Sequence, residues 1–288
     1  MDNILITGSN GQLGNELKAE SQKLKANWYF TDKNTLDITN FEAVEKYCEE
    51  KKITHIINCA AYTAVDKAEK DNINADKINH LAVKNLAIIA KRSNIILIHI
   101  STDYVFDGTN YIPYKENDKT NPQNVYGKTK LDGELAFKQS GAKGIIIRTS
   151  WVYSSYGNNF VKTMLRLSQI KDKLGIIFDQ IGTPTYAKDL ANTIIEILNT
   201  QKLDLLYAEI YHYSNEGVCS WYDFAKEIFS LSNIDIEINP IETKEYPTPA
   251  KRPNYSILNK SKIKQEFNIN IPHWKDSLKE MLKRYLNG

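Results

Sequence analysis

The sequence predicts an α/β fold in which a doubly wound parallel sheet is joined to a smaller C-terminal lobe. From residue 3 to residue 150, short apolar runs alternate with segments whose apolar residues recur at helical spacing. Such alternation is typical of βαβ units, which build parallel sheets. After residue 151 the alternation becomes irregular, and the segment 238–259 carries four of the eight prolines. We therefore expect two lobes, the first of which holds the sheet.

The first five strands are predicted from short, mainly apolar runs, as expected for parallel strands buried on both faces. The helices between them are predicted from apolar residues at helical period. The predicted strands cover 3–7, 27–32, 54–61, 95–102 and 144–150, and the predicted helices cover 11–24, 40–52, 74–92 and 126–139.

The remaining elements are predicted to finish the sheet and to build the second lobe. A helix near 158–170, a strand at 175–179, a helix at 187–200 and a strand at 209–214 are expected to complete the sheet, and a further helix is expected in HWKDSLKEMLKRYL. Because proline lacks an amide hydrogen, 238–259 is predicted to be an ordered irregular loop. The first domain is thus expected at 1–150, completed by parts of 175–214, and the second lobe mainly at 151–288.

Composition limits the class of protein and its partners. With 288 residues, of which 42% are hydrophobic and 25% charged, the chain is predicted to be a globular protein, most simply an enzyme. The 37 basic and 35 acidic residues nearly cancel, so no nucleic acid and no anionic membrane is expected as a partner. No apolar run approaches the roughly 18 residues of a membrane helix. The three cysteines match no metal or CxxC spacing, so a cytoplasmic protein with reduced thiols is expected.

A glycine-rich loop follows the first predicted strand and opens the first predicted helix. In TGSNGQLG, the residues Gly8, Gly11 and Gly14 have GxxGxxG spacing. Glycines there permit a tight turn and a close approach of the backbone to a pyrophosphate, while the helix N-terminus offers free N–H groups to the anion. Strand, loop, helix and a following βαβ unit together predict a Rossmann-type domain that binds a dinucleotide; a purely structural glycine turn is the alternative.

The end of the second predicted strand bears on the choice of cofactor. Asp32 lies 24 residues after Gly8, where an acidic residue commonly accepts a hydrogen bond from the adenosine ribose, which favours NADH. The adjacent Lys33 could instead meet a 2'-phosphate and favour NADPH, and Asp32 could also be a simple turn residue. The cofactor is therefore expected to be NADPH or NADH.

The chemical group is predicted from a tyrosine and a lysine four residues apart. Tyr126 and Lys130, in NVYGKTKLDGE, lie one above the other on the predicted helix. The fourth strand ends at Ser101, Thr102 and Asp103, so these side chains are expected in the same crevice as the glycine loop. A lysine ammonium and a nicotinamide charge nearby would lower the pKa of the tyrosine, which suits proton exchange with a carbonyl oxygen. Without such a pocket, the pair would be an ordinary helix face.

These residues resemble the extended short-chain dehydrogenase/reductase superfamily, whose catalytic unit is Ser or Thr with Tyr-x-x-x-Lys. Within it, the chain is similar to the dTDP-4-dehydrorhamnose reductase family in seven blocks, in order, over nearly the whole sequence. The blocks are GSNGQLG, AAYTAVDKAE, STDYVFDGT, NVYGKTKLDGE, RTSWVY, NNFVKTMLRL and YPTPAKRPNYSILN. The resemblance implies a Rossmann domain with a substrate lobe, and reduction of the 4-keto group of dTDP-4-dehydro-L-rhamnose by NADPH or NADH in dTDP-rhamnose biosynthesis.

The resemblance also implies roles for particular residues. Tyr126 would donate the proton, Lys130 would support it and bind the nicotinamide ribose, and Thr102 would adjust the proton transfer. The implied cofactor contacts are Gly11, Gln12 and Leu13 at the pyrophosphate, Asp32 at the ribose, Asp37 and Ile38 at the adenine, and Ala61, Tyr62 and Thr63 beside the cofactor. The implied substrate contacts are Thr102, Asp103 and Trp151.

Three further residues carry expectations about the substrate and a metal. Arg252, in the proline-rich loop, is predicted to clamp a diphosphate, because a guanidinium binds phosphate bidentately; a solvated surface arginine is the alternative. Some members of the family hold a magnesium ion at a dimer interface through glutamates, one at the position of Glu16. Lys188 stands where another of these glutamates would be, and a cation there would repel the ion. No metal is therefore expected, and a homodimer is not expected to use that ion.

Two other functions stay open at this point. A nucleotide-sugar 4,6-dehydratase or 4-epimerase would share the fold, and a dehydratase would carry an acidic pair after the threonine, whereas Thr102 is followed by Asp103 and Tyr104. A non-catalytic dinucleotide-binding regulatory subunit, like that of methionine adenosyltransferase, is the second alternative. A regulatory protein has no need of the complete set of threonine, tyrosine and lysine.

Overall fold

The protein is described by a computed structural model over residues 1–200 and 202–287, and its centre is a parallel sheet. Among these residues, six strands pair in the order β10-β5-β4-β3-β1-β2, and every pairing within this sheet is parallel. The strands are β1 (Asn3–Thr7), β2 (Asn27–Phe30), β3 (His55–Asn58), β4 (Ile96–Thr102), β5 (Gly144–Thr149) and β10 (Glu209–His212). The predicted doubly wound α/β fold is confirmed.

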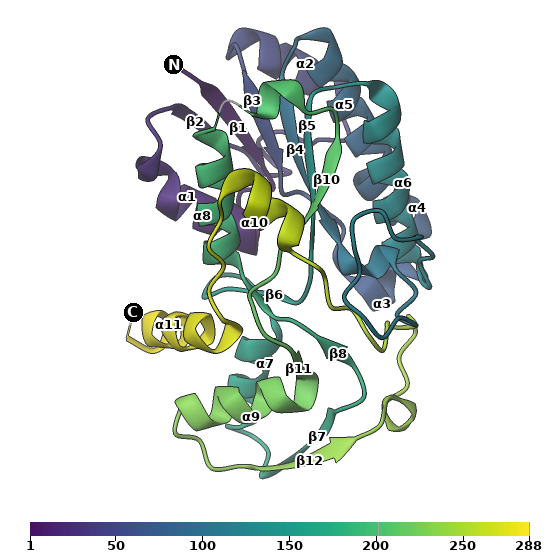
Figure 1. Cartoon of the computed structure of the whole chain (residues 1–288), viewed down its shortest axis with the longest axis vertical. Helices are drawn as coiled ribbons and strands as arrows, with labels where there is room; N and C mark the ends of the chain where they lie inside the picture. The colour runs from purple at the N-terminus through teal and green to yellow at the C-terminus, as the bar shows by residue number, and fades with distance from the viewer. Residues whose placement is uncertain (201, 288) are drawn as a thin grey trace.

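Helices cover both faces of this sheet (Figure 1). On one face lie α1 (Gln12–Glu20), α8 (Ala187–Leu198) and α10 (Ser261–Phe267), and on the other lie α2 (Phe41–Glu50), α5 (Ala82–Arg92) and α6 (Val125–Ser140). Successive side chains of a strand point to opposite faces. Ile4 and Ile6 of β1 therefore enter the core under α1 and α8, while Leu5 enters the core under α2 and α5.

The second lobe is built mainly from three helices and small two-stranded sheets (Figure 1). Its core joins aromatic and aliphatic side chains, among them Tyr153, Phe224 and Trp274. The helices are α7 (Phe160–Leu167), α9 (Trp221–Leu231) and α11 (Trp274–Asn287), and the strand pairs are β6 (Val152–Tyr153) with β9 (Thr185–Tyr186), β7 (Lys173–Ile177) with β12 (Glu237–Ile241), and β8 (Ile181–Gly182) with β11 (Cys219–Ser220).

Two predictions about the second half of the chain are wrong. The run at 175–179 does not complete the central sheet, because β7 pairs with β12 in a separate sheet, and the helix near 158–170 is α7, which packs in the core of the second lobe. The predicted helix and strand corresponding to α8 and β10 do complete the central sheet. In β7 exposed and buried residues alternate, which is the pattern of a strand covered on one face only. The proline-rich segment is not irregular throughout, since it begins inside β12. A two-stranded sheet tolerates Pro240 there because it consists only of edge strands.

The predicted helix at 74–92 is interrupted. It consists of α4 (Asn72–Asp76), a π-helical turn at Lys77–Leu81, and α5. A further short helix, α3 (Val65–Ala68), precedes it. The wider turn is placed beside the sheet's carboxyl edge, and Lys77 and Ile78 from it reach the cavity described below.

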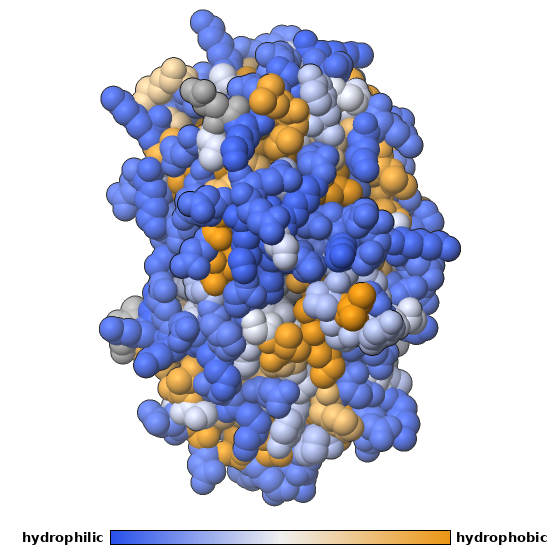
Figure 2. All heavy atoms as spheres, in the orientation of Figure 1, coloured by the Kyte–Doolittle hydropathy of each residue, from blue (hydrophilic) through white to orange (hydrophobic). Residues whose placement is uncertain are grey.

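The order of the strands places a crevice at one edge of the sheet. Strand order reverses at β1, because β2 lies on one side of it and β3 on the other. In open α/β sheets, ligands bind beyond the carboxyl ends of the strands at such a switch point. None of the helices formed by the described residues has the length and apolar character needed to span a membrane. Hydrophilic residues cover most of the face drawn in Figure 2, and its hydrophobic residues form small groups.

Candidate active site

A cavity of about 1170 Å³ lies beyond the carboxyl ends of the parallel strands. It is larger than the roughly 300–1,000 Å³ typical of a pocket for a drug-sized ligand. The predicted site residues that line it are Gly8, Gly11, Gln12, Leu13, Asp32, Asp37, Ile38, Ala61, Thr63, Thr102, Asp103, Tyr126, Lys130, Trp151 and Arg252. Residues from both lobes and from five strand ends therefore meet in one place, while Gly14 and Tyr62 do not line this cavity.

The glycine loop forms one wall of the cavity, at the start of α1. Gly8 has a left-handed backbone with φ +64°, and a Cβ there would lie 2.7 Å from backbone atoms of Ala60. Gly11 donates its backbone N–H to the carbonyl oxygen of Gly8 at 2.9 Å, which closes the turn. Gly14 packs the helix against this turn instead, because a Cβ there would lie 2.5 Å from Ser9 Cα. No side chain among the described residues caps the first turn of α1, so its free N–H groups fit an anionic ligand.

Asp32, Asp37 and Ile38, which were predicted to contact the cofactor's adenosine, line the cavity. The Oδ1 atom of Asp32 accepts hydrogen bonds from the backbone N–H of Asn34 at 3.0 Å and of Thr35 at 2.9 Å. The Thr35 donors lower the pKa of the Asp32 carboxyl. Asp32 is thus a turn residue that also lines the cavity, and its contact with a ribose stays a prediction.

Tyr62 holds the chain beside the cavity and does not point into it. Its hydroxyl donates to Asp71 Oδ2 at 2.9 Å, and its backbone N–H donates to Asn79 Oδ1 at 2.8 Å. Asn79 Nδ2 in turn donates to Thr129 Oγ1 at 3.2 Å on α6. The segment after β3 is therefore tied to α6, which keeps Ala61 and Thr63 at the cavity wall.

The start of α6 is fixed from three sides, and this fixes Tyr126. Asn124 is the N-cap, whose Oδ1 accepts from the backbone N–H of Gly127 at 2.8 Å, while its Nδ2 donates to the Lys251 carbonyl at 2.7 Å. A Cβ at Gly127 would lie 2.2 Å from the carbonyl oxygen of Tyr104. Only glycine lets α6 approach the turn after β4 this closely, and that approach brings Tyr126 to Thr102.

The predicted set of Thr102, Tyr126 and Lys130 comes together at the end of β4. The Thr102 hydroxyl donates to Asp103 Oδ1 at 3.0 Å and accepts from the backbone N–H of Tyr104 at 3.2 Å. The rings of Tyr126 and Tyr104 meet edge to face with centroids 5.5 Å apart. Lys130 is 1% exposed, and its Nζ donates to the carbonyl oxygen of Ile100 at 2.5 Å.

The protein groups alone do not lower the pKa of Tyr126, and the lowering expected with a nicotinamide charge nearby stays a prediction. Burial raises the pKa of Tyr126 to about 12, and a hydrogen bond with Thr102 only partly opposes that rise. The Lys130 ammonium does not reverse it, because Lys130 points its Nζ to Ile100. A phenol with a raised pKa keeps its proton at neutral pH and is a weak acid, so proton donation by Tyr126 requires a positive charge that lowers this pKa.

Asp103 is a buried carboxylate with an unused oxygen. It is 2% exposed, and its Oδ2 atom has no hydrogen-bond partner among the described residues. Burial raises the pKa of Asp103 to about 6, although hydrogen bonds with Ser256 and Thr102 oppose the rise. An unsatisfied buried acceptor destabilises a fold, and such groups are often kept for a ligand.

This carboxylate gives the protein a testable dependence on pH. The pKa of Asp103 is higher in the folded state than its usual 3.8, so the folded state binds the proton more tightly. The Asp103 contribution to the free energy of unfolding should therefore fall as pH rises from about 4 to about 6. We expect Asp103→Asn to be more stable than the wild type at about pH 8 by about 1–3 kcal/mol, with a much smaller difference at about pH 4. Urea unfolding at both pH values tests this, and an equal difference at both would contradict it.

An aromatic wall closes the cavity on the side of the second lobe. Trp151 has a left-handed backbone with φ +47°, which is rare for so large a residue, and its ring stacks on Trp221 with centroids 3.5 Å apart. Phe160 packs on Trp221 with centroids 4.6 Å apart. Trp151 was predicted to line the site, whereas Phe160 and Trp221 were not. The one signal for Trp221 was its place directly after Ser220, a typical helix-capping residue.

Arg252 reaches the cavity from the proline-rich loop but already has a partner. Its two terminal nitrogens donate to the carboxylate of Asp66 at 3.0 and 2.7 Å, and the pair is partly exposed. The backbone N–H of Ala250 also donates to Asp66. The arginine is therefore held by a carboxylate at the cavity wall, neither solvated nor free.

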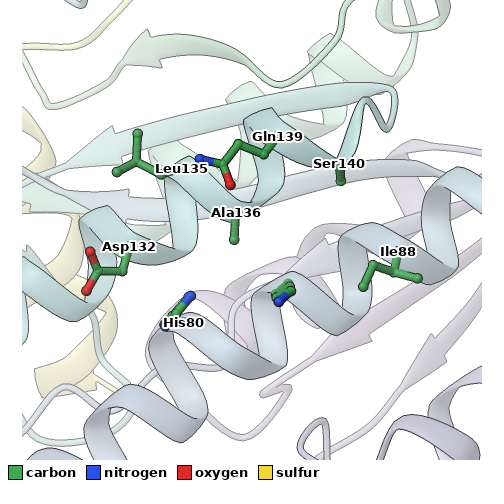
Figure 3. A pocket seen from close by; sticks show the side chains of 8 residues that line it. His80, Ile88, Asp132, Leu135, Ala136, Gln139 and Ser140 are labelled. Atoms are coloured by element: carbon green, nitrogen blue, oxygen red, sulfur yellow. The ribbon is translucent and has the colours of Figure 1, made fainter.

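Within the residues that the structure describes, Asp76, His80 and Asp132 form one group with metal-ligating atoms close together. Figure 3 shows His80 and Asp132 on two neighbouring helices that border a hollow of about 350 Å³. His80 Nδ1 lies 2.9 Å from Asp76 Oδ1, and Lys128 Nζ lies 2.7 Å from Asp132 Oδ2. These pairs account for the group, so we assign it no metal.

Comparison with known proteins decides the family. The family described as RmlD substrate binding domain matches residues 1–287, and dTDP-4-dehydrorhamnose reductase of Aggregatibacter actinomycetemcomitans is 44% identical over 98% of each protein. The chain belongs to the dTDP-4-dehydrorhamnose reductase family. The solved structure of the reductase from Clostridium acetobutylicum has a TM-score of 0.93 and 45% identity, covering 99% of each chain. That of the reductase from Bacillus anthracis, in complex with NADP, has a TM-score of 0.93 and 40% identity, covering 98% of this chain and 99% of that one.

The two positions that bear on magnesium in this family are engaged with other groups here. The buried Glu16 accepts from Arg284 Nη1 at 2.7 Å and from the Ser154 hydroxyl at 2.6 Å. Lys188 Nζ donates to Glu280 Oε1 at 2.6 Å. Both residues are thus engaged in ion pairs within the chain, and Lys188 is a cation at a position where a divalent ion would need a carboxylate.

Proposed function

We propose that the chain is a dTDP-4-dehydrorhamnose reductase, which reduces the 4-keto group of dTDP-4-dehydro-L-rhamnose to dTDP-L-rhamnose with NADPH or NADH. One observation carries this proposal. Thr102, Tyr126 and Lys130 share a cavity with the glycine loop, in a chain that matches reductases of this name over their whole length. The first 150 residues with α8 and β10 would bind the dinucleotide, and most of the remainder would bind the nucleotide sugar.

Each residue of the set has a distinct role in the proposed reaction. The bound nicotinamide supplies the hydride that goes to C4 of the sugar. Tyr126 donates its hydroxyl proton to the keto oxygen as charge develops there, and Thr102 holds the tyrosine hydroxyl in place. The ammonium of Lys130 stabilises the phenolate that remains and binds the nicotinamide ribose. Positioning and charge stabilisation are therefore the protein's share of catalysis.

NADPH is the cofactor that we favour, with NADH also accepted. The Bacillus anthracis relative was solved with NADP. Lys33 is exposed at the cavity, where it could meet a 2'-phosphate, while one oxygen of Asp32 is occupied by the turn at Asn34 and Thr35. Gly8, Gly11, Gln12 and Leu13 would hold the pyrophosphate at the start of α1.

The sugar nucleotide would lie against the aromatic wall, next to Asp103. The free Oδ2 of Asp103 would accept a hydrogen bond from a sugar hydroxyl, and Trp151 would offer a flat surface to the sugar or the base. Arg252 would bind the diphosphate and leave Asp66 in part to do so. The proposed reaction needs no magnesium ion at Glu16. The proposal also places the protein in the reducing cytoplasm, as expected from its three unpaired thiols.

Replacement of Arg252 tests the diphosphate contact. We expect Arg252→Lys to raise the KM for the nucleotide sugar by about 10-fold with little change in kcat, because lysine cannot make the bidentate contact. Steady-state kinetics with the sugar varied would measure this. Lys251→Met, which removes a neighbouring exposed cation, is the matched control and should leave the KM unchanged. A KM unchanged in Arg252→Lys would exclude Arg252 from the site.

A cofactor oxidation assay tests the function itself. The protein should consume NADPH only when dTDP-4-dehydro-L-rhamnose is supplied. Bound dinucleotide that is returned unchanged while the sugar is dehydrated or epimerised would favour the dehydratase or epimerase alternative. Cofactor binding without turnover of any keto sugar would favour the regulatory alternative.

A further inference from the structure

His99 is a polar residue in the most buried part of the sheet. It lies in the middle of β4, is 0% exposed, and pairs in register with Asn58 of β3. Leu97 and Ser101, two residues to either side, face α5 and α6, so His99 faces α6 as well. An apolar residue would be the ordinary choice at this position, because a buried polar ring costs free energy unless it is hydrogen-bonded.

The ring of His99 links the catalytic lysine to a buried chain of side chains. Lys130 Nζ lies 3.4 Å from His99 Nε2, and Asn58 Nδ2 lies 3.1 Å from His99 Nδ1. The Thr7 hydroxyl donates to Asn58 Oδ1 at 2.7 Å. All four residues are at most 1% exposed, so the side chains from Thr7 to His99 are shielded from water, and Lys130 ends the series at the cavity wall.

The hydrogen-bonding capacity of these groups allows two arrangements. In the first arrangement, Asn58 Nδ2 donates to His99 Nδ1, so the ring proton must be on Nε2. This N–H points at Lys130 Nζ, which can accept a hydrogen bond only when the lysine is an uncharged amine. In the second arrangement, the Asn58 amide is rotated by a half-turn, so that its oxygen faces His99 Nδ1 and accepts a hydrogen bond from it. The ring proton then sits on Nδ1, and Nε2 accepts from the Lys130 ammonium. Each protonation state of the lysine therefore has its own matching order of donors along the chain.

We propose that His99 is the positioning residue of Lys130: its uncharged ring accepts from the ammonium, and with Asn58 and Thr7 it reverses its hydrogen-bond order when the lysine loses its proton. The catalytic consequence rests on the proposed function, in which the ammonium stabilises the Tyr126 phenolate. His99 thus fixes where the charge of Lys130 lies and how firmly the lysine holds its proton.

The charges around Lys130 agree with this role. Burial lowers the pKa of Lys130 to about 8, while Glu134 on α6 and Cys59 after β3 act to raise it. Burial, and then the charge of Lys130, hold the pKa of His99 well below its usual range, so the ring stays uncharged. The titratable groups that act on the lysine are therefore His99, Glu134 and Cys59, and Tyr126 lies one turn earlier on the same helix. Of these, His99 contacts the lysine nitrogen as a neutral acceptor.

Nitrogen NMR of the wild-type protein tests the reversal without any activity assay. In protein labelled with 15N-histidine, we expect the ring proton of His99 to move from Nδ1 to Nε2 between about pH 6 and about pH 10 as Lys130 titrates. Lys130→Met should abolish this change. A His99 ring that keeps one tautomer over the whole range would overturn the proposal.

Kinetics of variants test the consequence for catalysis. His99→Leu removes the acceptor, and it should move the alkaline limb of the kcat profile to lower pH by about one unit or more. His99→Gln keeps a neutral acceptor, so its alkaline limb should lie close to that of the wild type. Leu97→Val, on the same face of the same strand, is the control for lost packing and should leave the limb in place.

The outcomes separate the two proposals. A His99→Leu profile identical to that of Leu97→Val would reduce His99 to a packing residue. If His99→Leu does not fold, His99→Gln and the wild-type nitrogen titration still decide. A wild type that never reduces the keto sugar would contradict the proposed function, whereas the nitrogen titration would still test His99.

Discussion

Tyr126→Phe is expected to remove nearly all turnover of the keto sugar while the cofactor still binds. The variant keeps the ring that packs against Tyr104 and loses only the hydroxyl beside Thr102. General acid catalysis of this kind typically contributes a factor of about 10² to 10⁴, so kcat should fall by that amount. The KM for the sugar and the affinity for NADPH should change only a few-fold. Steady-state kinetics and cofactor titration would measure both.

The matched control for this variant is another tyrosine that gives up a buried hydroxyl. Tyr114→Phe removes a hydroxyl that donates to Asp107 at 3.0 Å, outside the cavity. It should cost about 1 kcal/mol of stability and leave kcat unchanged. If Tyr126→Phe keeps more than about a tenth of the wild-type kcat, Tyr126 is not the acid.

Glu134→Gln is expected to destabilise the fold strongly. Glu134 and Arg148 form an ion pair 2.6 Å apart under α6, with side chains only 1% and 3% exposed. Ser101 also donates to Glu134, at 2.5 Å. Removal of one charge leaves the Arg148 guanidinium buried without its counter-ion, which typically costs about 3–5 kcal/mol. The midpoint of urea unfolding should fall accordingly at an unchanged m-value.

An exposed pair on the same helix separates burial from charge. Asp132→Asn breaks the pair between Asp132 and Lys128 on α6, and it should cost less than about 0.5 kcal/mol. The double variant Glu134→Gln/Arg148→Met should recover part of the loss, since no unpaired charge remains. A loss in Glu134→Gln no greater than that in Asp132→Asn would show that the buried pair does not hold α6.

Much of the first lobe could be predicted because local pattern and tertiary role agree there. The centre of β1, Ile4 to Ile6, is apolar because both faces of the strand are covered, and the glycine loop follows the strand at once. Helical spacing placed Tyr126 and Lys130 on one helix face, and the nearby glycine loop and the end of β4 were needed to predict a chemical role for them. The strand at β7 could not be placed in this way, because a short apolar run looks alike in a central sheet and in a two-stranded one.

What could not be predicted depends on contacts between distant segments. Arg252 meets Asp66 across 186 residues, and Trp221 stacks on Trp151 only once α9 has packed in the second lobe. His99 sits in the run IILIHIST, where it looks like one polar residue in a strand. Its role emerges only when Asn58 from β3 and Lys130 from α6 are placed on either side of its ring.

Transfer of a labelled hydride tests the central proposal most directly. The protein would be supplied with dTDP-4-dehydro-L-rhamnose and NADPH carrying deuterium at the reactive C4 position, and the product would be analysed by NMR and mass spectrometry. We expect one deuterium at C4 of the sugar and one oxidised cofactor for each product formed. A sugar that is altered at another carbon with no deuterium at C4, or a cofactor that keeps its label while the sugar reacts, would contradict the reductase assignment.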